Sequence, residues 1–423
     1  MARKATLPGT SETDQIVCHV DMDCFYAACE RLREPPLRGE PLVVGMGYEA
    51  GESHGAVATA SYEAREFGVE SAMAISEALS LLPRKIEVAQ SGDRPVSEAG
   101  FYRPVDLDWY ESVAKDVKVV LREYAETVRE VSIDEAYLDI TDRTTWEEVK
   151  QFVSELKDEI MQEVGVPASV GVAPTMSAAK VASDHDKPDG LVVVYPGEVA
   201  DFFEPLDVEA VHGVGPVTAS ALREMGIETA GDLAAADEHK LMDRFGERGR
   251  RVCQFARGAD TRSVEPRGKP KSFSRESAFT DATTDVEAVT ERIETLATAV
   301  ATRASQRDVL YQTIGIKVVK PPFDVNTRAQ SLPGPVSDSS LVTRVALSLF
   351  QEFEGTAVRK VGVRLSNLSF ESAEQPTLAD WDTPVESSEQ HSNSESETQS
   401  ETDTQTETVR DGQQSLTEYT GQE

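Results

Sequence analysis

The stretch VSIDEAY, residues 131–137, sets two adjacent carboxylates in a run of residues that favour β-strands. The segments 128–133 and 136–140 predict a β-hairpin that carries Asp134 and Glu135 at or near its turn. Polar side chains at a turn are free to converge with groups from other segments. The hairpin is therefore the first candidate for a functional site.

A matching acidic stretch, HVDMDCFY at residues 19–26, lies near the start of the chain. It overlaps a short buried strand predicted over residues 16–20, which ends at Asp21. Between the two stretches, apolar residues at helical spacing predict a helix over residues 109–124. The two acidic stretches form one site only if the fold returns the chain to its start.

The residues after the hairpin complete a repeating pattern. Thr145 and Glu148 predict a capping box ahead of a helix over residues 146–160, and a strand is predicted over residues 168–172. The predicted order is strand, helix, strand, strand, helix, strand. This order is typical of the split βαβ, ferredoxin-like arrangement, and it places the three carboxylates on one sheet.

Such a cluster of carboxylates suits Mg²⁺, which prefers hard oxygen ligands and keeps several waters. Asp21, Asp134 and Glu135 are the predicted ligands, with the carbonyl of Met22 as a fourth. Two such ions activate an attacking hydroxyl and stabilise a leaving phosphate. Either acidic motif alone is better explained as a surface turn. Their joint placement on one sheet edge favours the metal site.

Four motifs in order resemble those of the Y-family translesion DNA polymerases, most closely the DNA polymerase IV branch. The similarity extends over about residues 15 to 370. The motifs are DMDCFYAACE at 21–30, AVATASYEAR at 56–65, SIDEAYLDIT at 132–141, and SVGV at 169–172 with KPDG at 187–190. Four motifs in the family's order make a chance resemblance improbable.

The resemblance implies roles for individual residues. It implies two Mg²⁺ ions per active site and catalysis by the same three carboxylates, with Asp23 outside the metal set. The implied nucleotide-binding residues are Phe25, Tyr26, Tyr62, Arg65 and Lys187. Arg and Lys suit the charge that moves as pyrophosphate leaves. Tyr26 stands at the steric-gate position, where a ring excludes a 2′-hydroxyl. From spacing alone, a solvated arginine at Arg65 and a packing aromatic at Tyr62 are the better explanations, and a core tyrosine explains Tyr26 equally well.

The implied architecture is an α+β multidomain right hand. It has a ferredoxin-like palm, small fingers, a helical thumb with a helix-hairpin-helix, an α+β little finger and a disordered acidic tail. The predicted boundaries are palm 1–32 and 96–196, fingers 33–95, thumb 197–261, basic linker 262–270, little finger 271–370, acidic linker 371–412 and clamp-binding peptide 413–423. Several domains also follow from the length of 423 residues, since single cores seldom exceed about 250 residues.

The chain is strongly acidic, with a formal net charge of −33. Residues 371–423 hold 14 acidic residues and one arginine, which leaves a charge of −20 for the body. Such a body binds DNA only where salt screens the repulsion, so we hypothesise a halophilic archaeal source. Four cysteines show no metal or disulfide spacing, and no apolar run suits a membrane. We expect a cytoplasmic monomer.

Basic residues are exceptions on this background and predict DNA contacts. Residues 262–275 carry a local charge of +4, which favours a phosphate track over a solvated linker. Gly213 and Gly215 precede Pro216 in a predicted helix-hairpin-helix, whose backbone N–H groups approach a DNA phosphate. A last strand presents basic residues on its open face. The predicted DNA-binding residues are Gly213, Gly215, Lys269, Lys271, Arg275, Lys360 and Arg364.

The end of the chain has a different composition. Residues 371–412 are rich in Ser, Thr, Glu and Gln and are expected to be disordered. The peptide QQSLTEYT at 413–420 resembles the segments by which polymerases bind a sliding clamp, with Gln413, Leu416 and Tyr419 as anchors. A flexible linker that carries a short anchor raises effective concentration. Chance occurrence in a Gln-rich tail is the alternative.

The resemblance and the carboxylates together predict a template-directed DNA polymerase. It adds dNTPs to a primer 3′-hydroxyl on primer-template DNA, in error-prone translesion synthesis during DNA repair, and has no proofreading exonuclease. Two alternatives stay open at this point. One is another two-metal nucleotidyl enzyme such as a cyclase, which would not depend on DNA. The other is a non-catalytic scaffold that binds DNA and clamp, which would not need Asp134.

Overall fold

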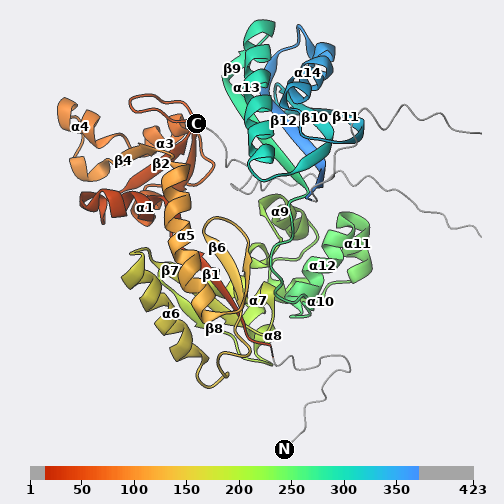
Figure 1. Ribbon diagram of the computed structural model, residues 1–423. Helices are drawn as coiled ribbons and strands as arrows, with labels where there is room; N and C mark the ends of the chain where they lie inside the picture. Colours follow the sequence, from red (N-terminus) through yellow and green to blue (C-terminus); the bar gives the residue numbers. More distant parts are fainter. Residues whose placement is uncertain (1–14, 371–423) are drawn as a thin grey trace, which may run out of the picture. The chain divides into compact units, whose positions relative to one another are not determined.

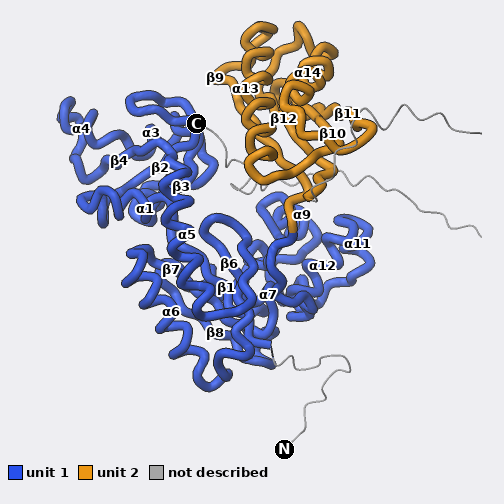
Figure 2. Tube along the Cα trace, in the orientation of Figure 1, with its two compact units in different colours: residues 1–268, 415–420 blue, residues 269–414, 421–423 orange. Residues whose placement is uncertain are grey.

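The computed structural model describes residues 15–370, which fall into two compact units (Figure 1, Figure 2). The first unit ends at Gly268 and the second begins at Lys269. Each unit has its own hydrophobic core. Among the described residues, no helix is both long and apolar enough to cross a membrane.

A five-stranded sheet in the order β5-β6-β1-β7-β8 forms the centre of the first unit. Its strands are β1 Val17–Met22, β5 Thr127–Glu130, β6 Glu135–Asp139, β7 Ala168–Ala173 and β8 Leu191–Val193. Strand β1 is central and pairs antiparallel with both β6 and β7. This is the predicted ferredoxin-like topology, extended by β8 alongside β7. The chain therefore does return to its start.

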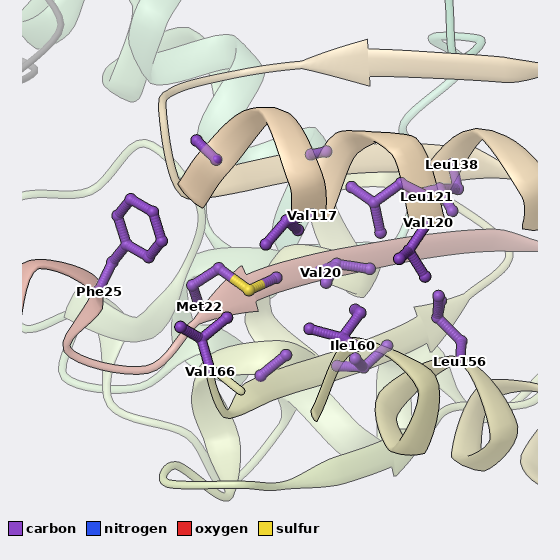
Figure 3. Close-up of a cluster of buried hydrophobic side chains, with 14 of the residues drawn as sticks. Val20, Met22, Phe25, Val117, Val120, Leu121, Leu138, Leu156, Ile160 and Val166 are labelled. Atoms are coloured by element: carbon purple, nitrogen blue, oxygen red, sulfur yellow. The ribbon is translucent and has the colours of Figure 1, made fainter. Parts of the chain in front are cut away.

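Helices cover both faces of this sheet, and the side chains of β1 alternate between the two faces. Cys18, Val20 and Met22 pack with α5 Leu107–Tyr124 and α6 Val149–Glu163 (Figure 3). Asp21 therefore lies on the opposite face, which α7 Met176–His185 covers. The core shown in Figure 3 fixes β1 in register and with it the direction of the Asp21 side chain.

Two local predictions in this domain need correction. Strand β5 ends at Glu130 rather than near Ile133, because the N–H groups of Val131 and Ser132 already turn back to the carbonyl of Glu135. The predicted capping box is wrong. Glu148 is itself the N-cap of α6 and makes no side-chain capping bond. A turn closed by Glu148 N–H and the Thr145 carbonyl starts the helix instead.

A small domain between β1 and α5 carries the nucleotide motif at residues 56–65. Its sheet has the order β3-β2-β4, with strands β2 Leu42–Met46, β3 Ala56–Ala60 and β4 Phe101–Pro104. Its helices are α2 Tyr62–Arg65, α3 Ile75–Leu81 and α4 Lys85–Ser91, and α1 Phe25–Arg33 joins it to β1. Strand β4 belongs to this sheet although it lies beyond residue 95, the predicted end of the fingers.

Short helices complete the first unit. They are α8 Val199–Phe203, α9 Pro216–Glu224, α10 Ala230–Ala235, α11 Glu238–Phe245 and α12 Glu247–Ala256. As predicted, Pro216 opens α9, and Gly226 follows it with a φ of 78° that favours glycine. The element before the glycine turn is only a single 3₁₀ turn, Val208–Ala210.

The second unit is a four-stranded antiparallel sheet in the order β11-β10-β12-β9. Its elements are β9 Ser272–Thr283, α13 Val286–Ser305, β10 Leu310–Lys320, β11 Asp324–Val336, α14 Ser339–Phe350 and β12 Val358–Ser369. Both helices pack on one face. The sequence pattern predicted every element but β11, an edge strand that is mostly exposed.

Candidate active site

Asp21 and Glu135 face each other across the palm sheet, as paired residues of β1 and β6. Both carboxylates hold the ammonium group of Lys180 on α7. Its Nζ lies 3.0 Å from Asp21 Oδ2 and 2.7 Å from Glu135 Oε1. The sheet thus brings together two of the three predicted carboxylates around one positive charge.

Asp134 lies beside this pair, at the end of the hairpin loop. The N–H of Met22 donates to the Asp134 carbonyl at 3.0 Å, which ties the loop to β1. The Ser132 hydroxyl donates to Asp134 Oδ1 at 2.5 Å and accepts the N–H groups of Asp134 and Glu135. The position of Asp134 is therefore fixed by backbone and side chain together.

The three carboxyl groups have unequal affinities for protons. Burial would raise the pKa of Asp21, but the ammonium groups of Lys180 and Lys187 hold it well below its ordinary value. Burial, opposed by Lys180 but reinforced by the charge of Asp21, raises the pKa of Glu135 to about 7. Burial also raises the pKa of Asp134. The three carboxyl groups together therefore favour the binding of an additional cation.

The donor set suits a divalent cation. Within residues 15–370, no three His, Cys, Asp or Glu side chains are already arranged as a metal cage. Asp21 and Glu135 nevertheless direct their oxygens at one cationic atom, and Asp134 adjoins them. Carboxylate oxygens are the ligands that Mg²⁺ prefers. A metal ion fits here if the Lys180 ammonium group leaves.

Lys187, a predicted nucleotide-binding residue, lies next to Asp21. Its Nζ lies 2.7 Å from Asp21 Oδ1 and 2.9 Å from Asp184 Oδ1. Its side chain is 22% exposed, so it remains open to a ligand. Lys180 and Asp184 did not come from sequence reasoning. The sequence signal that could have found them is their i, i+4 spacing, which places both on one face of α7.

Tyr62 and Arg65, the first and last residues of the four-residue helix α2, form a pair. The Arg65 guanidinium lies over the Tyr62 ring, 4.8 Å from its centroid, and its Nε donates to the Ala60 carbonyl. Ser61 caps this short helix through the Ala64 N–H. Arg65 is exposed and Tyr62 half-buried.

Asp23 follows β1 and holds the surrounding segments together through hydrogen bonds. Its buried carboxylate accepts the Ser169 hydroxyl, at 2.9 Å to either oxygen, and the Asp189 N–H at 2.8 Å. The Tyr62 hydroxyl donates to Oδ1 at 3.1 Å. Asp23 thus connects the motif at residues 56–65 to both parts of the motif at residues 169–172 and 187–190.

Phe25 and Tyr26, both predicted to contact the nucleotide, are buried. Phe25 belongs to the palm core, where Figure 3 shows it beside Met22 and Val166. The Tyr26 ring stacks on Tyr110 with centroids 4.5 Å apart. Tyr26 therefore lies against α5 in a fixed orientation.

Several predicted DNA-binding residues already have protein contacts. Gly213 adopts a φ of 89°, and its carbonyl accepts the Arg248 guanidinium at 3.0 Å; Gly215 is the N-cap of α9. Arg262, part of the basic segment, donates to both oxygens of buried Asp260 at 2.8 Å, and its side chain is 44% exposed. Asp260 also accepts the Ser177 N–H of α7.

In the second unit, the predicted face of β12 does look away from the core. Lys360, Gly362, Arg364 and Ser366 alternate with the buried residues Val361, Val363 and Leu365. Glu276 of β9 lies within this face and pairs with Lys317 at 3.0 Å and with Lys360 at 2.5 Å. Lys269 contacts the Phe370 ring, while Lys271 and Arg275 lie at or on β9. The predicted clamp anchors and acidic tail lie outside the described residues.

Comparisons with known proteins agree with this arrangement. The chain matches the model of the impB/mucB/samB family over residues 20–184 and that of the family's C-terminal domain over residues 270–378. It is 61% identical to DNA polymerase IV of Halobacterium salinarum, over 88% of this chain and 90% of that protein. DNA polymerase IV of Methanoculleus marisnigri is 39% identical, over 87% of this chain and 98% of that one.

Two solved polymerase structures are also similar to this chain. A Y-family DNA polymerase chimera, Dbh-Dpo4(243-245)-Dbh, aligns with a TM-score of 0.72 and 28% identity, covering 84% of this chain and 100% of its own. An insertion ternary complex of Dbh DNA polymerase aligns with a TM-score of 0.59 and 26% identity, covering 84% and 100%.

Proposed function

The chain belongs to the impB/mucB/samB family and is a template-directed translesion DNA polymerase of the Y family, and on that premise we propose that Asp21, Asp134 and Glu135 form its catalytic metal site. The family is metal-dependent, and the proposed ions are two Mg²⁺. The observation that carries the proposal is the pairing of Asp21 with Glu135 around a single cationic atom. A fourth ligand is the Met22 carbonyl.

Bound Mg²⁺ would supply activation of the primer 3′-hydroxyl and charge stabilisation on the phosphates. The residues of the chain bind and orient the nucleotide. Lys187, already at the carboxylates, exchanges its contact with Asp21 for the triphosphate. Arg65 offers a planar fork of donors to phosphate oxygens, with its ring partner Tyr62 holding it in place. Lys187 and Arg65 together thereby neutralise the negative charge of the triphosphate.

Tyr26 selects the deoxyribose. Its ring is 3% exposed and rests on Tyr110, so it cannot move aside for a 2′-hydroxyl. Phe25, the neighbouring residue in the palm core, is proposed as a further nucleotide contact. The proposed substrates are therefore dNTPs.

DNA contacts are proposed for the glycine turn and for the open face of the second unit. Exposed Arg364 and the lysines 269, 271 and 360 supply positive charge for the duplex backbone, with Arg275 beside them. Binding to a sliding clamp is proposed for Gln413, Leu416 and Tyr419. The polymerase acts as a monomer in the cytoplasm, and clamp binding compensates for a weak grip on DNA.

Primer extension tests the metal site directly. Wild-type protein is compared with Asp134→Asn and Glu135→Gln in molar KCl with dNTPs and Mg²⁺. We expect each variant to lose about 10²- to 10³-fold in rate, the scale of electrostatic catalysis. Asp139→Asn, at the other end of β6 and bonded to Thr141, is the matched control and keeps activity. Extension by either variant at the wild-type rate would refute the assignment.

A further inference from the structure

Lys180 is the least expected group in the site. Its side chain projects from α7 and is only 18% exposed. Besides Asp21 and Glu135, its Nζ contacts Asp184 at 3.2 Å, one helical turn further along α7. A single ammonium group thus neutralises two carboxylates that face each other across adjacent strands. Without it, like charges would meet inside the protein.

We propose that Lys180 is a built-in counter-ion, which occupies the place of a divalent cation between Asp21 and Glu135 and must leave when the cation binds. This inference rests on the proposed metal site. The ammonium group and a hard cation need the same carboxylate oxygens, so the two compete. Lys180 keeps the empty site folded and lowers its affinity for metal.

Asp184 gives the displaced ammonium group a destination. Its carboxylate is 47% exposed and lies one turn away on the same helix, within reach of a flexible lysine side chain. In the structure Asp184 is shared, because its Oδ1 also binds Lys187 at 2.9 Å. When a triphosphate draws Lys187 away, both Asp184 oxygens become available to Lys180, whose Nζ already contacts Oδ2 at 3.2 Å. Nucleotide binding therefore promotes departure of Lys180 and entry of the cation.

The first experiment measures Mn²⁺ affinity by titration calorimetry on the full chain in molar KCl, without DNA or nucleotide. Lys180→Met removes the charge and keeps the bulk. We expect it to bind Mn²⁺ at least tenfold more tightly than wild type, about 1.4 kcal/mol. Lys157→Met is the matched control, because Lys157 is similarly buried and contacts Asp189 rather than the catalytic carboxylates. Its Mn²⁺ affinity should equal that of wild type.

The same proteins are then melted in EDTA and in Mn²⁺. Lys180→Met should unfold at a lower temperature than wild type in EDTA and recover in Mn²⁺, because the metal replaces the missing charge. Unchanged or weaker Mn²⁺ binding by a folded Lys180→Met variant would overturn the proposal, since the lysine would then not compete.

A second measurement needs no variant. Lysine acetylation of wild-type protein is followed by mass spectrometry with and without Mn²⁺, with Lys157 as the internal reference. Displacement predicts that Mn²⁺ increases labelling of Lys180 at least threefold and leaves Lys157 unchanged. Equal labelling of Lys180 under both conditions, at Mn²⁺ levels that saturate the site, would refute it. If wild type, Lys180→Met and Lys157→Met all fail to bind Mn²⁺, the metal site itself is refuted. The proposed competition between Lys180 and the metal is then refuted as well.

Discussion

The hydroxyl of Tyr62 donates a hydrogen bond to Asp23, 3.1 Å from Oδ1, and so ties the start of the fingers helix α2 to the end of strand β1. Asp23 is 3% exposed and also accepts from Ser169 and Asp189. Asp23, the residue that follows β1, thus links α2 to β7 and to the loop at Asp189. This relationship leads to the first prediction.

Replacing Asp23 with alanine should destabilise the protein by about 3 kcal/mol, because several buried donors lose their acceptor. The check is thermal unfolding in molar KCl. Tyr62→Phe removes one of these bonds and serves as comparison. It should unfold close to wild type and raise the KM for dNTP more than it lowers kcat. An Asp23→Ala variant as stable as wild type would show that the network does not contribute.

Asp260 should make stability depend on pH in acid. Although burial opposes it, the hydrogen bonds and charge of Arg262 hold the pKa of Asp260 below its ordinary value. A carboxyl whose folded pKa is depressed contributes stability above its unfolded pKa, about 3.9, and loses it as pH falls through the folded pKa. Asp260→Asn should therefore cost about 2 kcal/mol at pH 7, and the difference should shrink as the pH falls below about 3.9 and through the folded pKa. Melting curves between pH 2.5 and pH 7 measure it, and a gap that stays constant would contradict the assignment.

Glu276 should weaken DNA binding by holding Lys317 and Lys360. Glu276→Gln keeps the shape and releases both lysines, so binding to primer-template DNA should tighten. The slope of log K against log salt should also steepen by about 1 to 2, as for one or two added phosphate contacts. Glu294→Gln, exposed on α13, makes the same change in net charge away from the sheet face. Fluorescence anisotropy across KCl concentrations compares them. Equal slopes for the two variants would argue against this role.

Tyr26→Ala should reduce discrimination against ribonucleotides at least about tenfold, because the ring that blocks the sugar is gone. Tyr26→Phe keeps the ring and its stacking on Tyr110, so it should select as wild type does. Single-nucleotide incorporation of dNTP and rNTP provides the ratio. If both variants discriminate equally well, another group is the gate.

The net charge of −33 should make stability depend on salt. Raising KCl from 0.1 M to 2 M shortens the Debye length from about 10 Å to below about 3 Å and screens the self-repulsion of the chain. The unfolding temperature should rise across this range, and primer extension should remain measurable in molar KCl. A protein that is most stable and most active in dilute buffer would remove the halophile hypothesis.

Much of the fold could be predicted because apolar periodicity and turn residues mark buried elements. The palm helices and strands, the start of α9 and the face of β12 all follow from such patterns. Strand β11, residues 324–336, could not be predicted, because it is an edge strand whose exposed side chains show no alternation and which contains Pro333. Its pairing with β10 is a property of the assembled sheet.

The candidate site could also be predicted in part. Asp21, Asp134 and Glu135 belong to motifs that resemble a known family, so their convergence could be anticipated. Lys180 carries no motif, and its contact with two carboxylates depends on the packing of α7 over β1. The engagement of Arg262 by Asp260 was likewise hidden, since a count of charges does not show which are already paired.

The central place of β1 in its sheet affects how the protein is made. Both strands that flank it, β6 and β7, are synthesised more than a hundred residues after it. At about 5–20 residues per second, the first strand spends seconds to tens of seconds on the ribosome without a partner. No fragment that ends before β7 contains a complete palm. High contact order of this kind slows folding, so the sheet that carries the catalytic carboxylates can close only after its last strand has emerged.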